Sequence, residues 1–297
     1  MKELVIISGK GGTGKTSVVA SFAALAERPV LADCDVDAAD LHLVLAPTVR
    51  HEEDFSGGKQ ARILPERCTG CGTCVELCRF DAIGKSPAGD YEVDPVACEG
   101  CGVCAWFCPE KAIEFGPVIN GRWFVSGTRF GPMVHARLGV AEENSGKLVT
   151  LVRNQARQIA EEGGHPYLVA DGAPGIGCPV IASIAGADLV LIVTEPTVAG
   201  VHDLERVADL TKHFGIRTAV CVNKADLNRE TTERILGRAG ERGLEPAGRI
   251  RYDRAVTAAQ VERKSVVEFT DGPVAGDIRR VWSSVVALLG EGDGPAD

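Results

Sequence analysis

A glycine-rich run near the amino terminus has the residue types and the spacing of a phosphate-binding loop. The run fits G-x-x-x-x-G-K-[ST] and consists of Gly9, Lys10, Gly11, Gly12, Thr13, Gly14, Lys15 and Thr16. Glycines let successive backbone N–H groups turn toward phosphate oxygens, and Lys15 brings a point charge to the β and γ oxygens. The Thr16 hydroxyl is suited to Mg2+. We therefore expect a nucleotide and Mg2+ to bind here; a glycine-rich turn without a ligand is the alternative.

Eight of the eleven cysteines repeat one spacing, C-x2-C-x2-C-x3-C. The first copy is Cys68, Cys71, Cys74 and Cys78, and the second is Cys98, Cys101, Cys104 and Cys108, followed by Pro109. Three closely spaced thiolates on a tight loop can hold three irons of a [4Fe-4S] cluster, and the fourth ligand must arrive from elsewhere. Structural zinc is the alternative, but paired zinc sites use well-separated C-x2-C pairs rather than three cysteines in tandem.

This run resembles that of the bacterial two-cluster ferredoxins, and the resemblance implies a crossed set of ligands. One 4Fe-4S cluster would be held by Cys68, Cys71, Cys74 and Cys108, and the other by Cys98, Cys101, Cys104 and Cys78. The first copy has Arg79 where a proline follows the fourth cysteine in the second copy. That departure concerns the turn and the local charge, and hence the potential, more than the ligand set.

Polar residues also follow several apolar runs directly in the chain. Asp33-Cys34-Asp35-Val36-Asp37 closes the second run, and Asp171-Gly-Ala-Pro-Gly175-Ile-Gly177 closes a later one. Asp33 and Asp37 have an alternative role as exposed turn carboxylates that cap the next helix. Val222-Asn223-Lys224-Ala225-Asp226 lies where P-loop proteins contact the base, and it also fits the N-K-x-D pattern that selects guanine. GTP therefore stays open as an alternative to ATP.

The order of apolar runs predicts the elements that would position these groups. A strand at residues 4–8 is followed by the glycine loop and by a helix at residues 15–27. Later strand-like and helix-like patterns alternate, which predicts an α/β fold with a doubly wound, mostly parallel sheet. The later strands are expected at 167–171, 188–194 and 218–223, a hairpin at 123–126 and 133–138, and helices at 146–162, 201–214, 229–242 and 275–289.

The alternation is interrupted where cysteine, glycine and proline gather. We interpret residues 62–115 as an inserted two-cluster ferredoxin-like α+β domain, between residues 1–61 and residues 116–297 of one P-loop domain. Outside the insert, Cys34 and Cys221 are expected to be small packed residues. Cys178 stays open between a cluster ligand and a helix-start thiol without a metal.

The loop GKGGTGKT, with Lys10 at its second position, resembles the deviant Walker A family of MinD-type ATPases, Mrp-type iron-sulfur carriers and the nitrogenase iron protein. With the cysteine-rich insert, the chain is identified as a member of the MinD-superfamily P-loop ATPases that contain an inserted ferredoxin domain. The resemblance implies an ATP-dependent homodimer in which Lys10 reaches the phosphates bound to the facing subunit. It also implies that Asp35 orients the attacking water and that Asp35 and Asp171 belong to the Mg2+ shell.

The same resemblance implies nucleotide contacts outside the loop. Lys15 would act on the phosphates as a catalytic residue, and Gly175 lies in the second switch segment. Asn223 would meet adenine, with Lys224 beside it. Arg251 replaces a proline that is common in the second adenine-contact loop of the family, so the choice of base is less well specified than phosphate binding.

Composition limits the class of protein. The chain has 297 residues, is 45% hydrophobic and 25% charged, and suits a globular protein of about two domains. Its longest apolar stretch is far shorter than the ~20 residues of a membrane helix, and its start lacks a signal-peptide cleavage site. We therefore expect a cytoplasmic protein with reduced thiols. A formal net charge of -9 disfavours nucleic acid and anionic membranes as partners.

Three functions are compatible with this sequence. The first is a redox enzyme in which ATP turnover in a homodimer is coupled to electron transfer through two 4Fe-4S clusters, with a redox or iron-sulfur partner protein. The second is an iron-sulfur cluster carrier or assembly ATPase, and the third is a positioning or cell-organisation ATPase with a redox-sensing insert. Eight cysteines in the ferredoxin spacing favour permanent clusters over cargo, so the first function is preferred.

Overall fold

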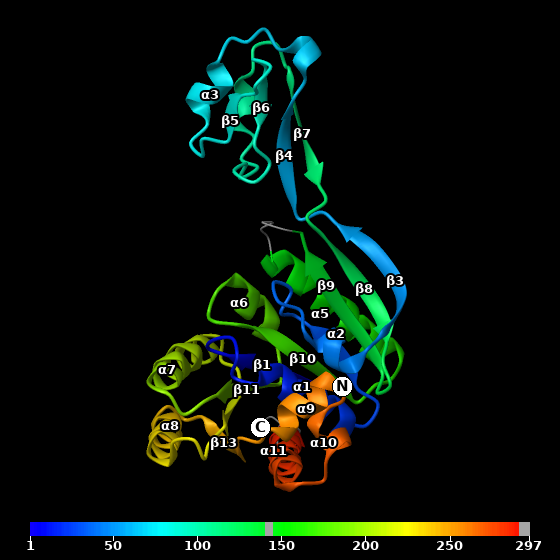
Figure 1. The fold of residues 1–297 in the computed structure, drawn as a ribbon, viewed down its shortest axis with the longest axis vertical. Helices are drawn as coiled ribbons and strands as arrows, with labels where there is room; N and C mark the ends of the chain where they lie inside the picture. The colour runs from blue at the N-terminus through cyan, green and yellow to red at the C-terminus, as the bar shows by residue number, and fades with distance from the viewer. Residues whose placement is uncertain (140–144, 291–297) are drawn as a thin grey trace, which may run out of the picture. The chain divides into compact units, whose positions relative to one another are not determined.

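The computed structural model describes residues 1–139 and 145–290, which form two compact units. The first unit contains Met1–Glu52, Trp123–Arg137 and the chain from Ser145 onward. The second contains Glu53–Arg122 and a short piece that begins at Leu138 (Figure 1). Within the described residues, no helix combines the length and the apolar character that a membrane span requires.

The first unit is built on a nine-stranded sheet in the order β13-β12-β11-β1-β10-β2-β9-β8-β3. From β13 to β9, each pair of neighbouring strands is parallel. The strand order reverses beside β1, which places the segment after β1 at the switch point where α/β proteins bind ligands. The bounds are β1 Lys2–Ser8, β2 Val30–Asp33, β3 Thr48–Phe55, β8 Gly121–Gly127, β9 Pro132–Leu138, β10 Tyr167–Pro174, β11 Leu189–Thr194, β12 Thr218–Asn223 and β13 Glu245–Ile250.

Helices cover the sheet in two groups. Helices α1 and α11 pack together on β1, β10, β11 and β13, with α9 and α10 beside them. Helices α5, α6, α7 and α8 pack against the strands in the other group, and the short helix α2 packs on α1. The bounds are α1 Lys15–Leu25, α2 Leu41–Leu45, α5 Ser145–Glu162, α6 Cys178–Ile184, α7 Val198–His213, α8 Arg229–Glu241, α9 Ala255–Val261, α10 Val266–Phe269 and α11 Pro273–Gly290.

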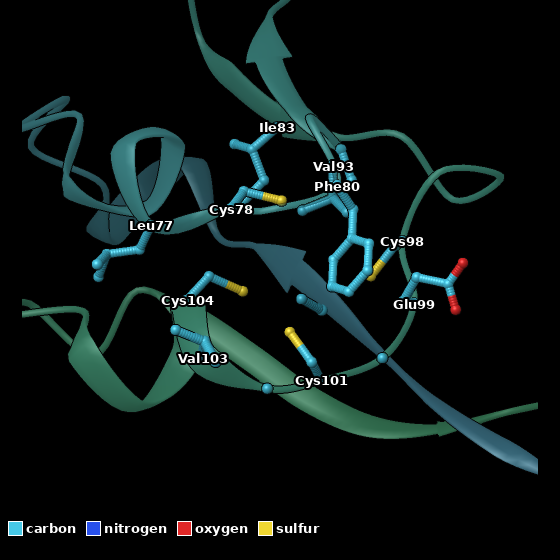
Figure 2. Close-up of a pocket in the computed structure, with 14 residues that line it drawn as sticks. Leu77, Cys78, Phe80, Ile83, Val93, Cys98, Glu99, Cys101, Val103 and Cys104 are labelled. Carbon is cyan, nitrogen blue, oxygen red and sulfur yellow. The ribbon is translucent and has the colours of Figure 1, made fainter.

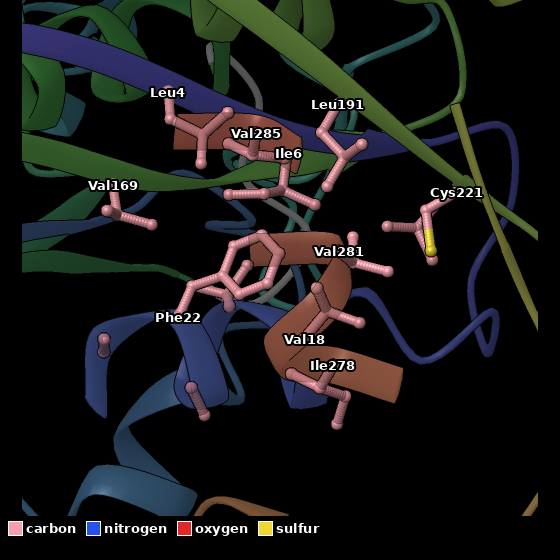
Figure 3. Packing of buried hydrophobic residues seen from close by; sticks show 14 of the residues in the cluster. Leu4, Ile6, Val18, Phe22, Val169, Leu191, Cys221, Ile278, Val281 and Val285 are labelled. Atoms are coloured by element: carbon pink, nitrogen blue, oxygen red, sulfur yellow. The ribbon is translucent and has the colours of Figure 1, made fainter. Parts of the chain in front are cut away.

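Strand β1 shows why this sheet needs apolar residues at every position. Leu4 and Ile6 are fully buried in a cluster with Phe22 of α1 and with residues of α11 (Figure 3). Val5 and Ile7, which alternate with them, are also fully buried. Each such side chain stabilises the fold by about 1.5–3 kcal/mol relative to an exposed one. The continuous apolar run is therefore the sequence of a strand that is covered on both faces.

The predicted alternation of strands and helices is confirmed, with small shifts at the ends. The expected hairpin corresponds to β8 and β9, joined by a turn in which the Thr128 N–H donates to the Gly131 carbonyl at 2.9 Å. Strand β10 continues past Asp171 to Pro174. Strand β3 was not predicted, because all of its residues before Phe55 are exposed and its sequence shows no apolar alternation.

The second unit is a small α+β structure. Strands β4 (Gly58–Ile63) and β7 (Ile113–Val118) form an antiparallel pair, as do β5 (Ile83–Lys85) and β6 (Tyr91–Val93). Helices α3 (Thr73–Leu77) and α4 (Val103–Phe107) have five residues each, and a 3-10 turn spans Pro65–Arg67. The unit extends beyond the interpreted insert, residues 62–115, because β4 and β7 continue the chain on both sides of the cysteines.

The repeated cysteine spacing adopts a repeated backbone. Helices α3 and α4 each begin one residue after a glycine with positive φ. Equivalent residues of the two copies have closely similar positive φ values: Gly70 70° and Gly100 62°, Gly72 78° and Gly102 76°, Asp81 52° and Lys111 48°. The duplication in the sequence is therefore also a duplication of local structure.

Candidate functional site

The glycine-rich run joins the end of β1 to the start of α1 at Lys15. Gly12 and Gly14 have φ values of +80° and +89°, a region that glycine enters without steric cost. A Cβ atom on Gly14 would lie 2.3 Å from Nδ2 of Asn223, at the end of β12. The loop needs its glycines both for its own turn and for this close approach.

Lys15 lies among three carboxylates at the ends of β2 and β10. Its Nζ contacts Oδ1 of Asp171 and is 3.4 Å from Oδ2 of Asp35. The side chains of Lys15 and Asp171 are 6% and 1% exposed. Asp33 is fully buried and accepts the backbone N–H groups of Asp35 and Leu41, each at 3.2 Å. Asp33 is thus a buried member of this cluster rather than an exposed carboxylate, although it does accept the N–H of Leu41, the first residue of α2.

Burial governs the ionisation of this cluster. It raises the pKa of Asp33 well above its usual value; the charge of Asp171 adds to the shift and Lys15 opposes it. Burial likewise raises the pKa of Asp35 against the effect of Lys15. Burial acts to lower the pKa of Lys15, but Asp171 and Asp35 outweigh it and the pKa is raised. The cluster holds more acidic groups than basic ones and would be stabilised by further positive charge.

Two buried polar atoms of the loop and the acid cluster have no hydrogen-bond partner among the described residues. These atoms are Oδ2 of Asp171 and Oγ1 of Thr13. Thr16 is half-buried in the first turn of α1. Gly175, with φ +90°, donates its N–H to the Ser8 carbonyl at 2.8 Å and so fixes the end of β10 beside the loop. An open carboxylate oxygen of this kind suits a hard cation such as Mg2+.

Lys10 is held within its own chain by Glu195, which follows β11. Its Nζ lies 2.6 Å from Oε1 of Glu195, and Nζ of Lys224 lies 3.0 Å from Oε2. Lys224 also donates to the Gly12 carbonyl at 3.0 Å and has a φ of +56°. Burial acts to raise the pKa of Glu195, but its hydrogen bonds from Lys10 and Lys224 outweigh burial and lower it. Both lysines therefore share one carboxylate at the mouth of the loop.

Glu195 was not predicted to contact the loop lysines. A strand-end carboxylate after an apolar run is the only signal available, and it does not show that β11 lies next to β1. The pairing of these two strands brings Glu195 to the loop.

Asn223 supports the loop in this structure. Its Nδ2 donates to the Thr13 carbonyl at 2.7 Å, and its Oδ1 accepts the Lys224 N–H at 2.9 Å. Asp226, the residue that would select guanine, accepts the Tyr252 N–H through Oδ1 at 2.7 Å. The segment expected to contact the base thus lies beside the loop, with several of its polar groups already engaged.

Arg251 is paired with Asp277 of α11 through two of its nitrogens, at 2.5 and 3.1 Å. These bonds tie the end of β13 to α11. The structure thus gives Arg251 a role in packing, at the position where the resembled family has a proline.

The three remaining cysteines differ in their surroundings. Cys34 and Cys221 are fully buried, as expected, and burial raises the pKa of both thiols, that of Cys221 to about 12. Cys178 is exposed at the first residue of α6.

The eight repeated cysteines surround two cavities of the second unit, four to each. One cavity is lined by Cys68, Cys71, Cys74 and Cys108. The other is lined by Cys78, Cys98, Cys101 and Cys104, whose sulfurs point toward a common space (Figure 2). Each cavity therefore takes three cysteines from one copy of the repeat and the fourth from the other.

The cysteines enclose these cavities rather than meet at a point. Among the described residues, no three histidine, cysteine, aspartate or glutamate side chains are placed to share one metal ion. Burial raises the pKa of Cys74 and of its counterpart Cys104, and backbone N–H groups oppose the shift in both. The Thr73 hydroxyl, at 3.5 Å from the Cys71 sulfur, lowers the pKa of Cys71.

Comparisons with solved structures show the fold of the first unit. The MinD cell division ATPase of Pyrococcus furiosus superposes with a TM-score of 0.57 and 15% identity, covering 97% of this chain and 99% of that one. The septum site-determining protein MinD of Pyrococcus horikoshii, solved with Mg-ADP, gives a TM-score of 0.58 and 15% identity, with 98% of each chain covered. At such identity the likeness extends to the fold alone.

Sequence comparison assigns the family. An uncharacterized protein of Methanocaldococcus jannaschii is 33% identical over 237 residues, which cover 76% of this chain and 79% of that protein. The family model described as the CobQ/CobB/MinD/ParA nucleotide binding domain matches residues 4–266, which include the glycine loop, the buried acids and the segment of Asn223. The chain therefore belongs to the CobQ/CobB/MinD/ParA nucleotide-binding family, as an α/β P-loop NTPase with a mostly parallel central sheet.

Proposed function

We propose that this protein is an ATP-hydrolysing homodimer that couples its nucleotide state to electron transfer through two 4Fe-4S clusters. The observation that carries the proposal is the crossed enclosure of two cavities by two copies of one cysteine spacing. A cluster of four irons gives each iron its own thiolate, so its ligands must surround a space. A nucleotide site and two such cavities in one chain support a coupled function.

The nucleotide would occupy the loop and the buried acids. Lys15 would exchange its contacts with Asp171 and Asp35 for phosphate oxygens, which carry more negative charge. Asp35 would then be free to orient the attacking water, while Thr16 and the open Oδ2 of Asp171 face the Mg2+ shell. The involvement of Asp226 with the Tyr252 N–H supports ATP over GTP, and competition between the two nucleotides tests this choice.

Lys10 is the residue that we assign to the dimer. It is the more exposed of the two loop lysines, at 36%, and its present partner is a single carboxylate. In the proposed dimer it would leave Glu195 and bind the phosphates of the facing subunit. Light scattering with a non-hydrolysable ATP analogue is expected to show a dimer for the unmodified protein and a monomer for Lys10→Ala. A dimer that persists in Lys10→Ala would contradict this role.

The cysteine cavities would hold the clusters in crossed sets, Cys68, Cys71, Cys74 and Cys108 in one and Cys98, Cys101, Cys104 and Cys78 in the other. The clusters would supply one-electron redox chemistry. The protein contributes thiolates that are positioned on tight glycine turns, and an apolar lining that limits water around the second cavity.

Chemical analysis tests this assignment. Protein purified without oxygen is expected to contain about eight iron and eight acid-labile sulfide per chain. Cys74→Ser should reduce the iron bound in the cavity of Cys74, and Cys104→Ser should reduce the iron bound in the cavity of Cys104. Each variant is therefore the control for the other. Iron near four per chain, or stoichiometric zinc, would contradict the two-cluster assignment.

A cluster carrier is the second candidate, and the exposure of Cys71 and Cys101 favours it. Exposed thiolates would let an acceptor protein reach a cluster. Transfer of iron to an apo-ferredoxin, faster with ATP than without it, would support the carrier over the redox enzyme. Retention of all iron under the same conditions would support permanent clusters.

A further inference from the structure

The duplicated halves of the second unit allow each cavity to be compared with its own counterpart. The two cysteine loops share their spacing and their turn geometry, with Gly72 at φ 78°, ψ -7° and Gly102 at φ 76°, ψ -2°. The backbone is therefore nearly the same around both sets of thiolates. Differences between the cavities must arise from side chains.

One difference concerns a side chain beside a sulfur. Thr73 follows Gly72 in the first copy, and its Oγ1 lies 3.5 Å from the Cys71 sulfur. Val103 holds the same place after Gly102 in the second copy, beside Cys101. A thiolate bound to iron has no proton, so at this contact the Thr73 hydroxyl must be the donor. The side chain of valine has no group that could donate.

The remaining lining residues differ less. The Cys71 cavity is lined by Thr69 and Tyr91 together with the apolar Ile63 and Ile113, and the Cys101 cavity is lined by Phe80, Leu77 and Val93 (Figure 2). The sulfur of Cys108, in the first of these cavities, accepts the Ala112 N–H at 3.3 Å.

The acidic residues of the two linings do not account for the contrast. Each cavity has one acidic residue in its lining, Glu110 in the first and Glu99 in the second. The cavities therefore differ in the hydroxyl donor beside the sulfur rather than in the number of carboxylates.

We propose that Thr73, with Val103 as its apolar counterpart, makes the two cluster sites unequal, so that the site of Cys71 has the higher reduction potential and holds the first electron. The inference rests on the proposed function, because it concerns the clusters assigned there. An added electron increases the negative charge on the sulfur ligands, and a hydrogen bond to sulfur stabilises that charge. The Cys101 site, with Val103 in place of the hydroxyl, offers less stabilisation and is reduced at a lower potential.

The direction of electron movement follows from this order of reduction potentials. A one-electron donor, dithionite in the test, reduces one cluster by one electron and is itself oxidised. An electron that enters at the Cys101 site moves to the Cys71 site, with no bond made or broken and no change in the total number of electrons. Thr73 is thus a positioning residue: through its hydrogen bond to the Cys71 sulfur, it decides at which of the two sites the electron stays.

The two copies supply matched variants for the test. The unmodified protein, Thr73→Val, Val103→Thr and the double exchange are titrated without oxygen, with the reduced clusters followed by electron paramagnetic resonance. We expect two midpoint potentials in the unmodified protein, separated by at least about 59 mV. For a one-electron couple, this separation is a tenfold difference in the equilibrium constant of reduction. Thr73→Val should lower the higher midpoint, and Val103→Thr should raise the lower one. Thr73→Ser keeps the hydroxyl and should restore the higher midpoint.

The outcomes separate this inference from the function on which it rests. Eight iron per chain with coincident midpoints, or with midpoints that Thr73→Val leaves unchanged, would overturn the inference and leave the two-cluster assignment intact. Protein without iron would overturn both. A shift of the higher midpoint in Thr73→Val, with its iron content unchanged, supports the inference and excludes a purely structural role for Thr73.

Discussion

The nucleotide site contains one lysine among three carboxylates. Lys15 contacts Asp171 and lies 3.4 Å from Asp35, and Asp33 is fully buried in the same cluster. Removing one partner of a buried ion pair leaves an uncompensated charge and typically costs about 3–5 kcal/mol. The same lysine is therefore expected to contribute to the stability of the empty protein and to the binding of phosphate.

We expect Lys15→Met to abolish nucleotide binding and to lower the free energy of unfolding by about 3–5 kcal/mol at pH 8. Burial raises the pKa of Asp33 and Asp35 in the folded protein. A carboxyl group with a raised pKa stabilises the fold below its unfolded pKa, and this contribution is lost as the pH rises through the folded pKa. Without Lys15 both pKa values rise further, so the destabilisation should grow with pH.

Urea denaturation without nucleotide, at several pH values between 5 and 8, measures this effect. Lys264→Met is the control, because Lys264 forms an exposed pair with Glu262. An equal loss of stability by Lys15→Met at every pH would show that the carboxylates do not depend on the lysine charge.

Glu195→Gln should release Lys10 and Lys224 from their shared carboxylate. The Nζ atoms of Lys10 and Lys224 lie 2.6 and 3.0 Å from the Glu195 carboxylate oxygens. Because Lys10 is 36% exposed, its ion pair with Glu195 contributes at most about 1 kcal/mol. We expect an affinity for Mg-ATP up to about fivefold higher, since phosphate no longer competes with Glu195. Titration with a fluorescent ATP analogue measures it, with Glu205→Gln, on α7, as the control. Weaker binding would show instead that Glu195 aligns Lys10 for the phosphates.

Among the elements, the two cysteine loops differ in how closely they pack. A Cβ atom on Gly100 would lie 2.2 Å from the Lys59 carbonyl of β4, whereas a Cβ on Gly70, its equivalent, meets nothing within 4 Å. Both glycines have positive φ, which costs other residues about 1–2 kcal/mol. Replacement by alanine thus adds the same backbone strain at both positions and a steric clash at only one.

We therefore expect Gly100→Ala to displace the second cysteine loop and to leave about four iron per chain instead of about eight. Gly70→Ala should keep nearly all of its iron and is the matched control. Iron and sulfide assays after purification without oxygen provide the measurement. Equal losses in the two variants would indicate that backbone strain, rather than contact with β4, decides the result.

The elements also differ in how well they could be predicted from their sequences. Strand β12 was predicted at its observed bounds, because a strand buried on both faces has an apolar residue at almost every position. Strand β3 is exposed at every residue before Phe55, so no pattern marked it. Helices α3 and α4 have five residues each, too few for a helical period to repeat.

For the whole molecule, the question is whether nucleotide and cysteine sites are coupled. The segment that contains Asp33 and Asp35 continues through α2 and β3, and the chain passes from the first unit to the second at Glu53. A γ-phosphate that orders this segment, as in other P-loop switches, would act on the connection to the second unit. The chain thus provides a short covalent path between the two kinds of site.

We expect the cluster midpoints to shift between protein with ADP and protein with a non-hydrolysable ATP analogue. A typical coupling free energy of ~1–3 kcal/mol corresponds to a shift on the order of 40–130 mV for a one-electron couple. Thermodynamic linkage requires that reduction change the affinity for ATP by the same factor. Redox titrations measure the midpoint potentials in each nucleotide state. Nucleotide titrations of the oxidised and the reduced protein measure the affinity for ATP. Superimposable midpoints would favour the carrier over the redox enzyme.

The sequence by itself determined the class of fold and predicted the chemistry that its motifs suit. The glycine loop and the cysteine repeat are local patterns, and their side chains are adjacent in the chain, so spacing alone indicates which ligand they suit. The alternation of apolar strands and amphipathic helices determined the parallel sheet, because burial on both faces requires it.

Only the tertiary structure decided which residues meet. Strand order brings Glu195 to Lys10 and Asn223 to Thr13, although long stretches of chain separate them. The contact between Lys15 and the buried acids likewise depends on where backbones approach. Contacts between distant residues leave no local period in a sequence, since they are fixed by packing of the whole chain rather than by neighbouring residues.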